Sequence, residues 1–295
     1  MGVDNLLAPV IDGVTNAVEN AVQNDNGLRN QTTSAIIGDI NSSNQLTIFE
    51  KQVVTEAVIR NANQLKKENI EDILSRANSI LVSKNLQILN GIEKVNTNWM
   101  LEFLDNCENT TDADMKEIWA KILSSECETP GSVSKRLLGI LRIIDKNVAE
   151  IFGKICSHTV ILQCPYGEKS MQFIIPYLRA TSYNNKIIDD FITKLGFTSN
   201  GITELENLGL IDYCYAGYVY ECNEMVVDYY GDKLLLKPSG KNKTYIDAGQ
   251  YQYSRYGLEL ARILYEDKAC EKDVGYIDFL AEYLSTERKN EVQRI

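Results

Sequence analysis

The sequence predicts an α+β protein: a mainly helical N-terminal half, then a winged-helix-like module with a small antiparallel sheet. Two observations carry this prediction. Apolar residues of the first 157 positions recur at helical spacing, and all sixteen tyrosines lie at or after Tyr166, in runs that alternate as strands do. We expect three regions: an N-terminal amphipathic helix and linker over 1–45, a helical core over 46–160, and the winged-helix-like module with a C-terminal helix over 161–295.

The first predicted helix, over residues 3–22, carries a narrow apolar seam. Its apolar residues are spaced alternately by four and three positions, which is the spacing of a helix that pairs with another helix. Pro9 kinks or restarts the helix near its beginning. A single helix of this length is marginal in water. We therefore expect a homo-oligomer that self-associates through Val3, Leu7, Val10 and Val14.

The helical core is predicted to contain several amphipathic helices. Residues 47–89 indicate one long helix or a hairpin, whose apolar stripes are split by the polar segment 66–69. Two more helices place Trp99 and Trp119 on apolar faces. The carboxylates around them lie mostly off those faces, and Glu117 stands four residues before Lys121. We interpret these acids as ordinary helix faces, because paired catalytic carboxylates need a partly desolvated site.

Residues 119–132 contain the string W-A-x-I-L-x-x-E-x-x-x-P-G-S. On this string, the chain resembles the bacterial family known as domain of unknown function 2806. The likeness covers residues 95–157 well and extends more loosely to about residue 265. Val133 departs from the Phe that the family has after Pro-Gly-Ser. The resemblance implies a bacterial or phage-encoded cytosolic protein and, by association, a role in antiviral defence, but it brings no catalytic residue.

Charge and hydropathy exclude several classes of protein. The net charge is −11, which opposes general binding to nucleic acid or anionic lipid, and no apolar run is long enough for a transmembrane helix. The N-terminal residues lack the basic and apolar parts of a secretory signal. Seven cysteines are scattered without a C-x-x-C pair, as in proteins that keep reduced thiols. We expect a cytoplasmic protein.

The second half has the element order of a winged helix, in which helices precede strands and a further helix. Residues 199–208 stand where a recognition helix would lie, but they hold Glu204 and Glu206 and no Lys or Arg. Residues 186–266 contain eight Lys or Arg against twelve Asp or Glu, a net charge of −4, so a protein and not a nucleic acid is the expected partner. The interaction residues that we single out are Lys233, Lys237, Lys241, Lys243, Tyr218 and Tyr220.

The sequence contains few residues that could act in catalysis or bind a metal. The single histidine, His158, lies between Cys156 and Cys164, and a zinc site would also need Cys214 or Cys222. A packed histidine is the favoured interpretation, and we predict no catalytic residue, metal or cofactor. The leading hypothesis is a non-enzymatic interaction or regulatory protein. The alternatives are a winged-helix DNA-binding regulator, a cryptic hydrolase or nuclease, and a membrane-acting effector.

Overall fold

The computed structural model describes residues 38, 41–42, 48–86, 88–164, 169–173, 195–216, 219–238, 244–247, 250–266, 272–286 and 290–295. The chain divides into two compact units, Met1–Ile143 and Ile144–Ile295. The described part of the first is helical, and the second combines helices with antiparallel sheets, which confirms the α+β class. The division between the units precedes the change of composition near residue 166, because helix α8 (Lys146–Ser157) belongs to the second unit and precedes its strands.

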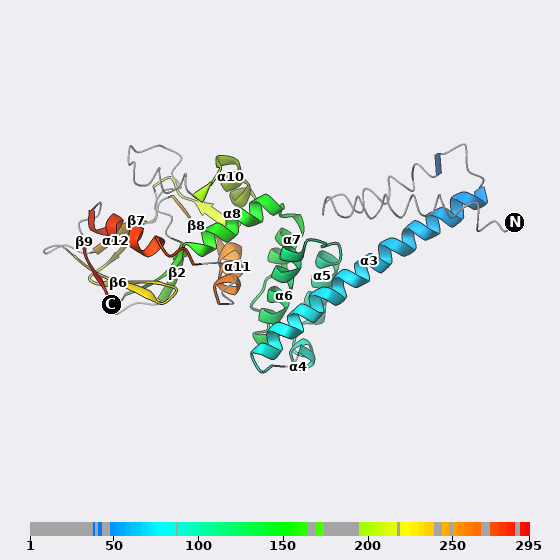
Figure 1. Cartoon of the computed structure of the whole chain (residues 1–295), viewed down its shortest axis with the longest axis horizontal. Helices are drawn as coiled ribbons and strands as arrows, with labels where there is room; N and C mark the ends of the chain where they lie inside the picture. Colours follow the sequence, from blue (N-terminus) through cyan, green and yellow to red (C-terminus); the bar gives the residue numbers. More distant parts are fainter. Residues whose placement is uncertain are drawn as a thin grey trace. The chain divides into compact units, whose positions relative to one another are not determined.

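The described helices of the first unit are α3 (Ile48–Ser83), α4 (Ile88–Ile92), α5 (Thr97–Cys107), α6 (Ala113–Glu128) and α7 (Lys135–Ile143). Figure 1 shows α6 lying against the C-terminal half of α3. The α3 side of this contact buries Ile73, Ala77 and Leu81. On α6, Trp119 is only 1% exposed, and its ring meets Phe103 of α5 edge-on at a centroid distance of 5.5 Å. The expected apolar face around Trp119 is confirmed.

Helix α3 continues through Lys66–Asn69, so the helix alternative is correct and the hairpin is not. The amide of Asn69 donates to the backbone oxygen of Glu108 at 2.9 Å, and the Lys66 ammonium lies 2.5 Å from the Glu108 carboxylate. The Glu108 carbonyl thus satisfies the buried amide of Asn69, and the Glu108 carboxylate pairs with the partly exposed Lys66. The polar segment is therefore a contact between helices.

Several acidic residues near the tryptophans hold the helices in place. Asp112 caps α6, because its carboxylate accepts hydrogen bonds from the backbone N–H groups of Asp114 and Met115 at 3.0 and 3.1 Å. Glu117 pairs with Lys121 at 2.7 Å, as predicted. These acidic residues therefore cap a helix or form ion pairs on a helix surface.

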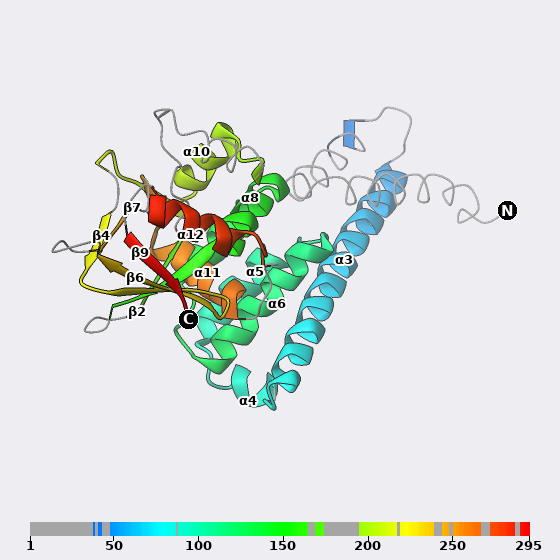
Figure 2. The ribbon, with the colours of Figure 1, turned by 60° about the vertical axis from the view of Figure 1, so that its left-hand side comes forward.

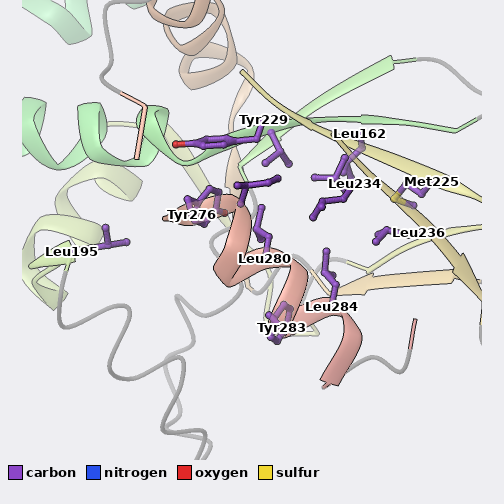
Figure 3. Close-up of a cluster of buried hydrophobic side chains, with 13 residues drawn as sticks. Leu162, Leu195, Met225, Tyr229, Leu234, Leu236, Tyr276, Leu280, Tyr283 and Leu284 are labelled. Atoms are coloured by element: carbon purple, nitrogen blue, oxygen red, sulfur yellow. The ribbon is translucent and has the colours of Figure 1, made fainter. Parts of the chain in front are cut away.

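A five-stranded antiparallel sheet with the order β2-β1-β5-β6-β9 forms the centre of the second unit. Its strands are β1 (Thr159–Gln163), β2 (Lys169–Phe173), β5 (Met225–Tyr229), β6 (Asp232–Pro238) and β9 (Asn290–Arg294). Alternate side chains of β5 are buried, as expected for a sheet with one covered face. Helix α12 (Tyr276–Thr286) covers that face (Figure 2). In Figure 3, Tyr276, Leu280 and Leu284 of α12 lie against sheet residues that include Leu162 and Leu234.

The rest of the described second unit comprises α8, α10 (Ser199–Asn207), α11 (Arg255–Glu266) and two ladders of two strands. One ladder pairs β3 (Ile211–Tyr213) with β8 (Tyr251–Tyr253), and the other pairs β4 (Val219–Cys222) with β7 (Thr244–Asp247). Helix α8 packs against α10 and α11. Helix α11 also approaches the chain before β3 so closely that a Cβ atom at Gly257 would lie 1.8 Å from the carbonyl oxygen of Leu210. This position therefore requires glycine.

Some predicted features lie outside the described residues. The seam residues Val3, Leu7, Val10 and Val14 are among them, as are Tyr218, Lys241 and Lys243. Their proposed roles stay predictions. Across the part of the chain that the structure describes, no helix combines the length and the hydropathy needed to cross a membrane.

Candidate functional site

The string that carries the family resemblance forms a turn around a buried carboxylate. Glu126 is 2% exposed, and its two oxygens accept hydrogen bonds from the backbone N–H groups of Gly131 at 2.7 Å and Val133 at 3.0 Å. Gly131 has a φ of +86°, a left-handed conformation that glycine adopts readily. The carbonyl oxygen of Val133 in turn accepts from the indole N–H of Trp99 at 2.9 Å. The Glu126 turn is thus a structural feature that ties α5 to the connection between α6 and α7.

Ser157, His158 and Asp273 meet in the second unit and have the composition of a catalytic triad. The Ser157 hydroxyl lies 2.9 Å from His158 Nδ1, and Asp273 Oδ2 lies 3.3 Å from Nε2. However, Nδ1 also lies 2.7 Å from the carbonyl oxygen of Lys154. A carbonyl oxygen only accepts, so Nδ1 carries a hydrogen and cannot take the proton of Ser157. The arrangement does not activate this serine.

His158 instead connects α8 to the chain that precedes α12. Its side chain is 5% exposed and meets the ring of Tyr276 edge-on at a centroid distance of 4.7 Å. The Tyr229 hydroxyl donates to the Ser157 carbonyl at 2.7 Å and accepts from the backbone N–H of Asp273 at 2.9 Å. This geometry agrees with the interpretation of His158 as a packed residue.

The residues considered for zinc do not all gather around His158. His158 precedes β1 and Cys164 follows it, so the strand holds them apart. The thiol of Cys156 accepts a hydrogen bond from the hydroxyl of buried Tyr253. Among the residues that the structure describes, no three His, Cys, Asp or Glu side chains gather as metal ligands would. The cysteine near His158 therefore belongs to the packing of α8.

Two of the predicted interaction lysines lie on one face of the sheet. Lys233 and Lys237 belong to β6, on the face opposite to the buried side chains of that strand. Lys233 lies 3.7 Å from Asp228, and Lys237 lies 3.9 Å from Glu224. Each cation thus faces a carboxylate that would compete with a phosphate group. Tyr220 lies on β4, where its backbone is paired with Ile246 of β7.

A different aromatic surface forms on the ladder of β3 and β8. Tyr213 and Tyr251 are direct partners in this ladder, and their ring centroids are 5.2 Å apart. Tyr213 is 36% exposed, and Tyr215 is 84% exposed. We call Tyr213, Tyr215 and Tyr251 the tyrosine face. The sequence analysis singled out Tyr218 and Tyr220 instead. The Tyr-x-Tyr repeats at 213–215 and 251–253 indicate strands with tyrosines on one face, but they do not give the pairing of the two strands.

A carboxylate of α10 lies near the tyrosine face. Burial raises the pKa of the Tyr251 hydroxyl, and the nearby charge of Glu206 on α10 raises it further. The Tyr251 hydroxyl therefore stays neutral near pH 7 beside a negative charge. Such a surface attracts cations through both the carboxylate and the aromatic rings.

Backbone contacts hold the tyrosine face in position. The backbone N–H of Cys214 donates to the Gln250 carbonyl at 2.7 Å, and the Gln250 side-chain amide donates to the Tyr215 carbonyl at 2.8 Å. Gly209, with a φ of +75°, ends α10 just before β3. The backbone that carries the tyrosine face is therefore held by hydrogen bonds between β3 and β8, next to the end of α10.

The first unit contains a hollow of about 400 Å³ near the end of α3, lined by Leu81, Asn85, Leu86, Gly91, Lys94, Cys127 and Glu128. Glu128 is paired with Lys84 at 2.6 Å. Burial, with smaller contributions from the neighbouring carboxylates Glu126 and Glu128, raises the pKa of the Cys127 thiol to about 11. This thiol stays protonated near neutral pH and is a poor nucleophile.

Comparison with known proteins gives one match. A family model described as "Protein of unknown function (DUF2806)" matches residues 55–279, a range that begins in α3 and ends in α12. A search of the curated proteins and a search of the solved structures gave no match.

Proposed function

The chain belongs to the DUF2806 family, and from that premise we propose that it is a non-enzymatic interaction or regulatory protein of the bacterial cytoplasm. The tyrosine face of the second unit is the proposed binding surface, and its partner is a protein that presents cationic side chains. The observation that carries the proposal is the exposure of Tyr213 and Tyr215 on a face whose third tyrosine, Tyr251, lies near the Glu206 carboxylate of α10.

Part of the proposal is that α8, α10, α11 and the β3–β8 ladder form a winged-helix-like module. The order of these elements along the chain supports it, as does the packing of α8 against both other helices. The wing would be the β3–β8 ladder. The strands β4 to β7 come between β3 and β8 in the sequence, as an insertion into this wing.

The charge of α10 favours a protein partner over duplex DNA. In the proposed module this helix takes the recognition position, and its exposed side includes Thr203, Glu204 and Glu206. A duplex docked there would meet two carboxylates, whereas DNA-binding surfaces gain affinity from cations that displace counterions. Tyrosines instead bury a wide area with few rotatable bonds, and they are enriched at protein interfaces.

Site-directed photo-crosslinking tests the proposed surface. A photo-reactive phenylalanine analogue replaces Tyr215 in the full chain, which is produced in bacterial cells and irradiated. We expect a discrete cross-linked protein whose yield falls several-fold when Glu204→Lys and Glu206→Lys are added, because charge reversal repels a cationic partner. The matched control carries the analogue at Val274, which is 80% exposed in the same unit.

Equal cross-linking at both positions would count against the tyrosine face. Fluorescence anisotropy with a random duplex at low salt provides the second measurement, and we expect no saturable binding at micromolar protein. Tight, salt-sensitive binding that is lost in the Lys233→Glu, Lys237→Glu double variant would instead favour the DNA-binding regulator.

A further inference from the structure

Two cysteines of the second unit meet at one corner of the five-stranded sheet. Cys164 follows β1 directly, and Cys222 is the last residue of β4, three positions before β5 begins at Met225. Strands β1 and β5 are antiparallel partners, with Gln163 opposite Val226. One more step in this register brings Cys164 level with Met225. The ends of β1 and β4 therefore lie close together, although 58 positions separate the cysteines in sequence.

The two side chains also lie on one core. Both cysteines are free thiols of intermediate burial, and both pack against the apolar core beneath α12. The Cys222 thiol contributes to the raised pKa of the Cys164 thiol, as expected for two groups that the strand register brings near each other. A small movement of chain segments that already share a core would bring the two sulfur atoms to bonding distance.

We propose that Cys164 and Cys222 are a redox-sensitive modification site, at which a small-molecule disulfide oxidises the pair to an intramolecular disulfide. One protein thiolate attacks the reagent, forming a mixed disulfide and releasing one reagent thiolate. The second protein thiolate then attacks the protein sulfur of that mixed disulfide and releases the other. The two protein thiols each lose a proton, which the released thiolates take up, so one reagent disulfide is reduced to two thiols.

The bond would add a covalent link between two parts of the second unit. It would tie the β4–β7 ladder to the end of β1 in the five-stranded sheet, and so restrict the position of the insertion between β3 and β8. Closing a long loop also restricts the unfolded chain, so the oxidised protein should melt at a higher temperature. This inference is independent of the proposed binding surface.

The rate of bond formation should depend on pH. Burial, with a smaller contribution from the neighbouring Cys222 thiol, raises the pKa of the Cys164 thiol to about 11. Only the thiolate reacts, so the step that uses Cys164 should accelerate roughly tenfold for each pH unit below that value. The site is therefore slow near neutral pH and responds to sustained oxidation.

The test uses the full chain and oxidised glutathione. After incubation, free thiols are counted in denaturant and peptides are mapped by mass spectrometry without reduction. We expect the protein to lose two of its seven thiols and to yield a peptide pair joined through Cys164 and Cys222, with a mass lower by two hydrogen atoms. Dithiothreitol should reverse both changes, and the melting temperature should be several degrees higher in the oxidised form.

Variants separate this pair from the other thiols. Cys164→Ser and Cys222→Ser should each stop at a mixed disulfide with glutathione, while Cys214→Ser, a matched change at another half-buried cysteine, should still form the bond. The mapping of the unmodified chain decides the outcome even if a serine variant folds poorly. Separate glutathione adducts on Cys164 and Cys222, a bond between other cysteines, or no loss of thiols would each overturn the proposal.

Discussion

Glu126 is a carboxylate inside an apolar helical core, and its charge is stabilised there by backbone N–H groups that converge on both of its oxygens. These hydrogen bonds are charge-assisted, so they are stronger than those between neutral groups. The same turn presents the Val133 carbonyl to Trp99. One side chain therefore fixes the exit of α6 and, through the turn, the position of α5.

We predict that Glu126→Gln destabilises the first unit by about 2–3 kcal/mol, because the amide nitrogen of glutamine would face a backbone N–H group and leave it unpaired. Both tryptophans lie in this unit, so their fluorescence during urea unfolding reports on it alone. Glu128→Gln is the control, since its contact with Lys84 is a partly exposed pair and its loss should change stability by less than about 1 kcal/mol. Equal unfolding midpoints for the two variants would contradict the structural role of Glu126.

Single residues show what the sequence can and cannot predict. The burial of Trp119 follows from helical spacing alone, because its neighbours one turn away on α6, Met115 and Leu123, are apolar. The role of Glu126 does not, since its partners are backbone groups five and seven residues later and their direction depends on the left-handed Gly131. The tyrosine face shows the same limit, because only the β3–β8 register places Tyr213 opposite Tyr251.

At the scale of elements, α3 and α6 are joined by charges as well as by their apolar faces. Asp72 lies 2.9 Å from both Arg76 and Lys116, and Glu117 lies 2.7 Å from Lys121 and 3.5 Å from Arg76. The hydrogen bonds from Arg76 and then Lys116 lower the pKa of Asp72, and that from Lys121 lowers the pKa of Glu117. This network lies along the outer edge of the α3–α6 contact.

The network predicts how the first unit responds to acid. A carboxyl group with a lowered folded-state pKa stabilises the fold above its ordinary pKa, and this stabilisation disappears as pH falls through the folded-state value. For Asp72 and Glu117 the loss should begin near their ordinary values of 3.8 and 4.5 and continue below them. Asp72→Asn should reduce stability near neutral pH by at most about 1 kcal/mol, because the pair is partly exposed, and it should flatten the acid response.

Urea unfolding followed by tryptophan fluorescence, repeated from neutral to acidic pH, measures this effect. Glu71→Gln is the matched control on α3, since Glu71 forms a looser pair of 3.7 Å with Lys67 that is mostly exposed. An Asp72→Asn protein with the same pH dependence as the Glu71→Gln protein would show that the network does not couple the helices.

The sheet illustrates which element-level features lie beyond sequence reasoning. Alternation and the Gly-containing turns predict strands in the tyrosine-rich half, and β3 to β8 lie there. The alternation does not predict that β1 pairs with β5, or that residues 290–294 return as β9 beside β6. Such pairings join segments far apart in the chain, and they depend on the core that α12 completes. The helix predicted after the strands is present as α11, but the additional helix α12 and the strand β9 that follow it were not predicted.

At the scale of the whole molecule, the net charge of −11 opposes close approach of two copies. Self-association therefore needs an apolar surface that outweighs this repulsion, and the predicted seam of residues 3–22 is the surface that we propose for it. Added salt screens the repulsion, so the oligomer should be more stable at higher ionic strength. A complex held by ion pairs between copies would respond in the opposite direction.

Light scattering of the full chain and of a chain lacking residues 1–25 tests this proposal, and we expect the truncated protein to have the mass of a single chain.

A finer comparison uses two variants that add the same charge to the predicted helix. Leu7→Asp with Val14→Asp places carboxylates on the seam and should abolish association, because a charged group at a helix–helix contact loses its hydration without gaining a partner. Asn5→Asp with Asn16→Asp places them off the seam and should leave the mass of the oligomer unchanged. If both variants dissociate alike, charge and not the seam controls assembly, and if the truncated chain keeps the mass of the full oligomer, the interface lies elsewhere in the molecule.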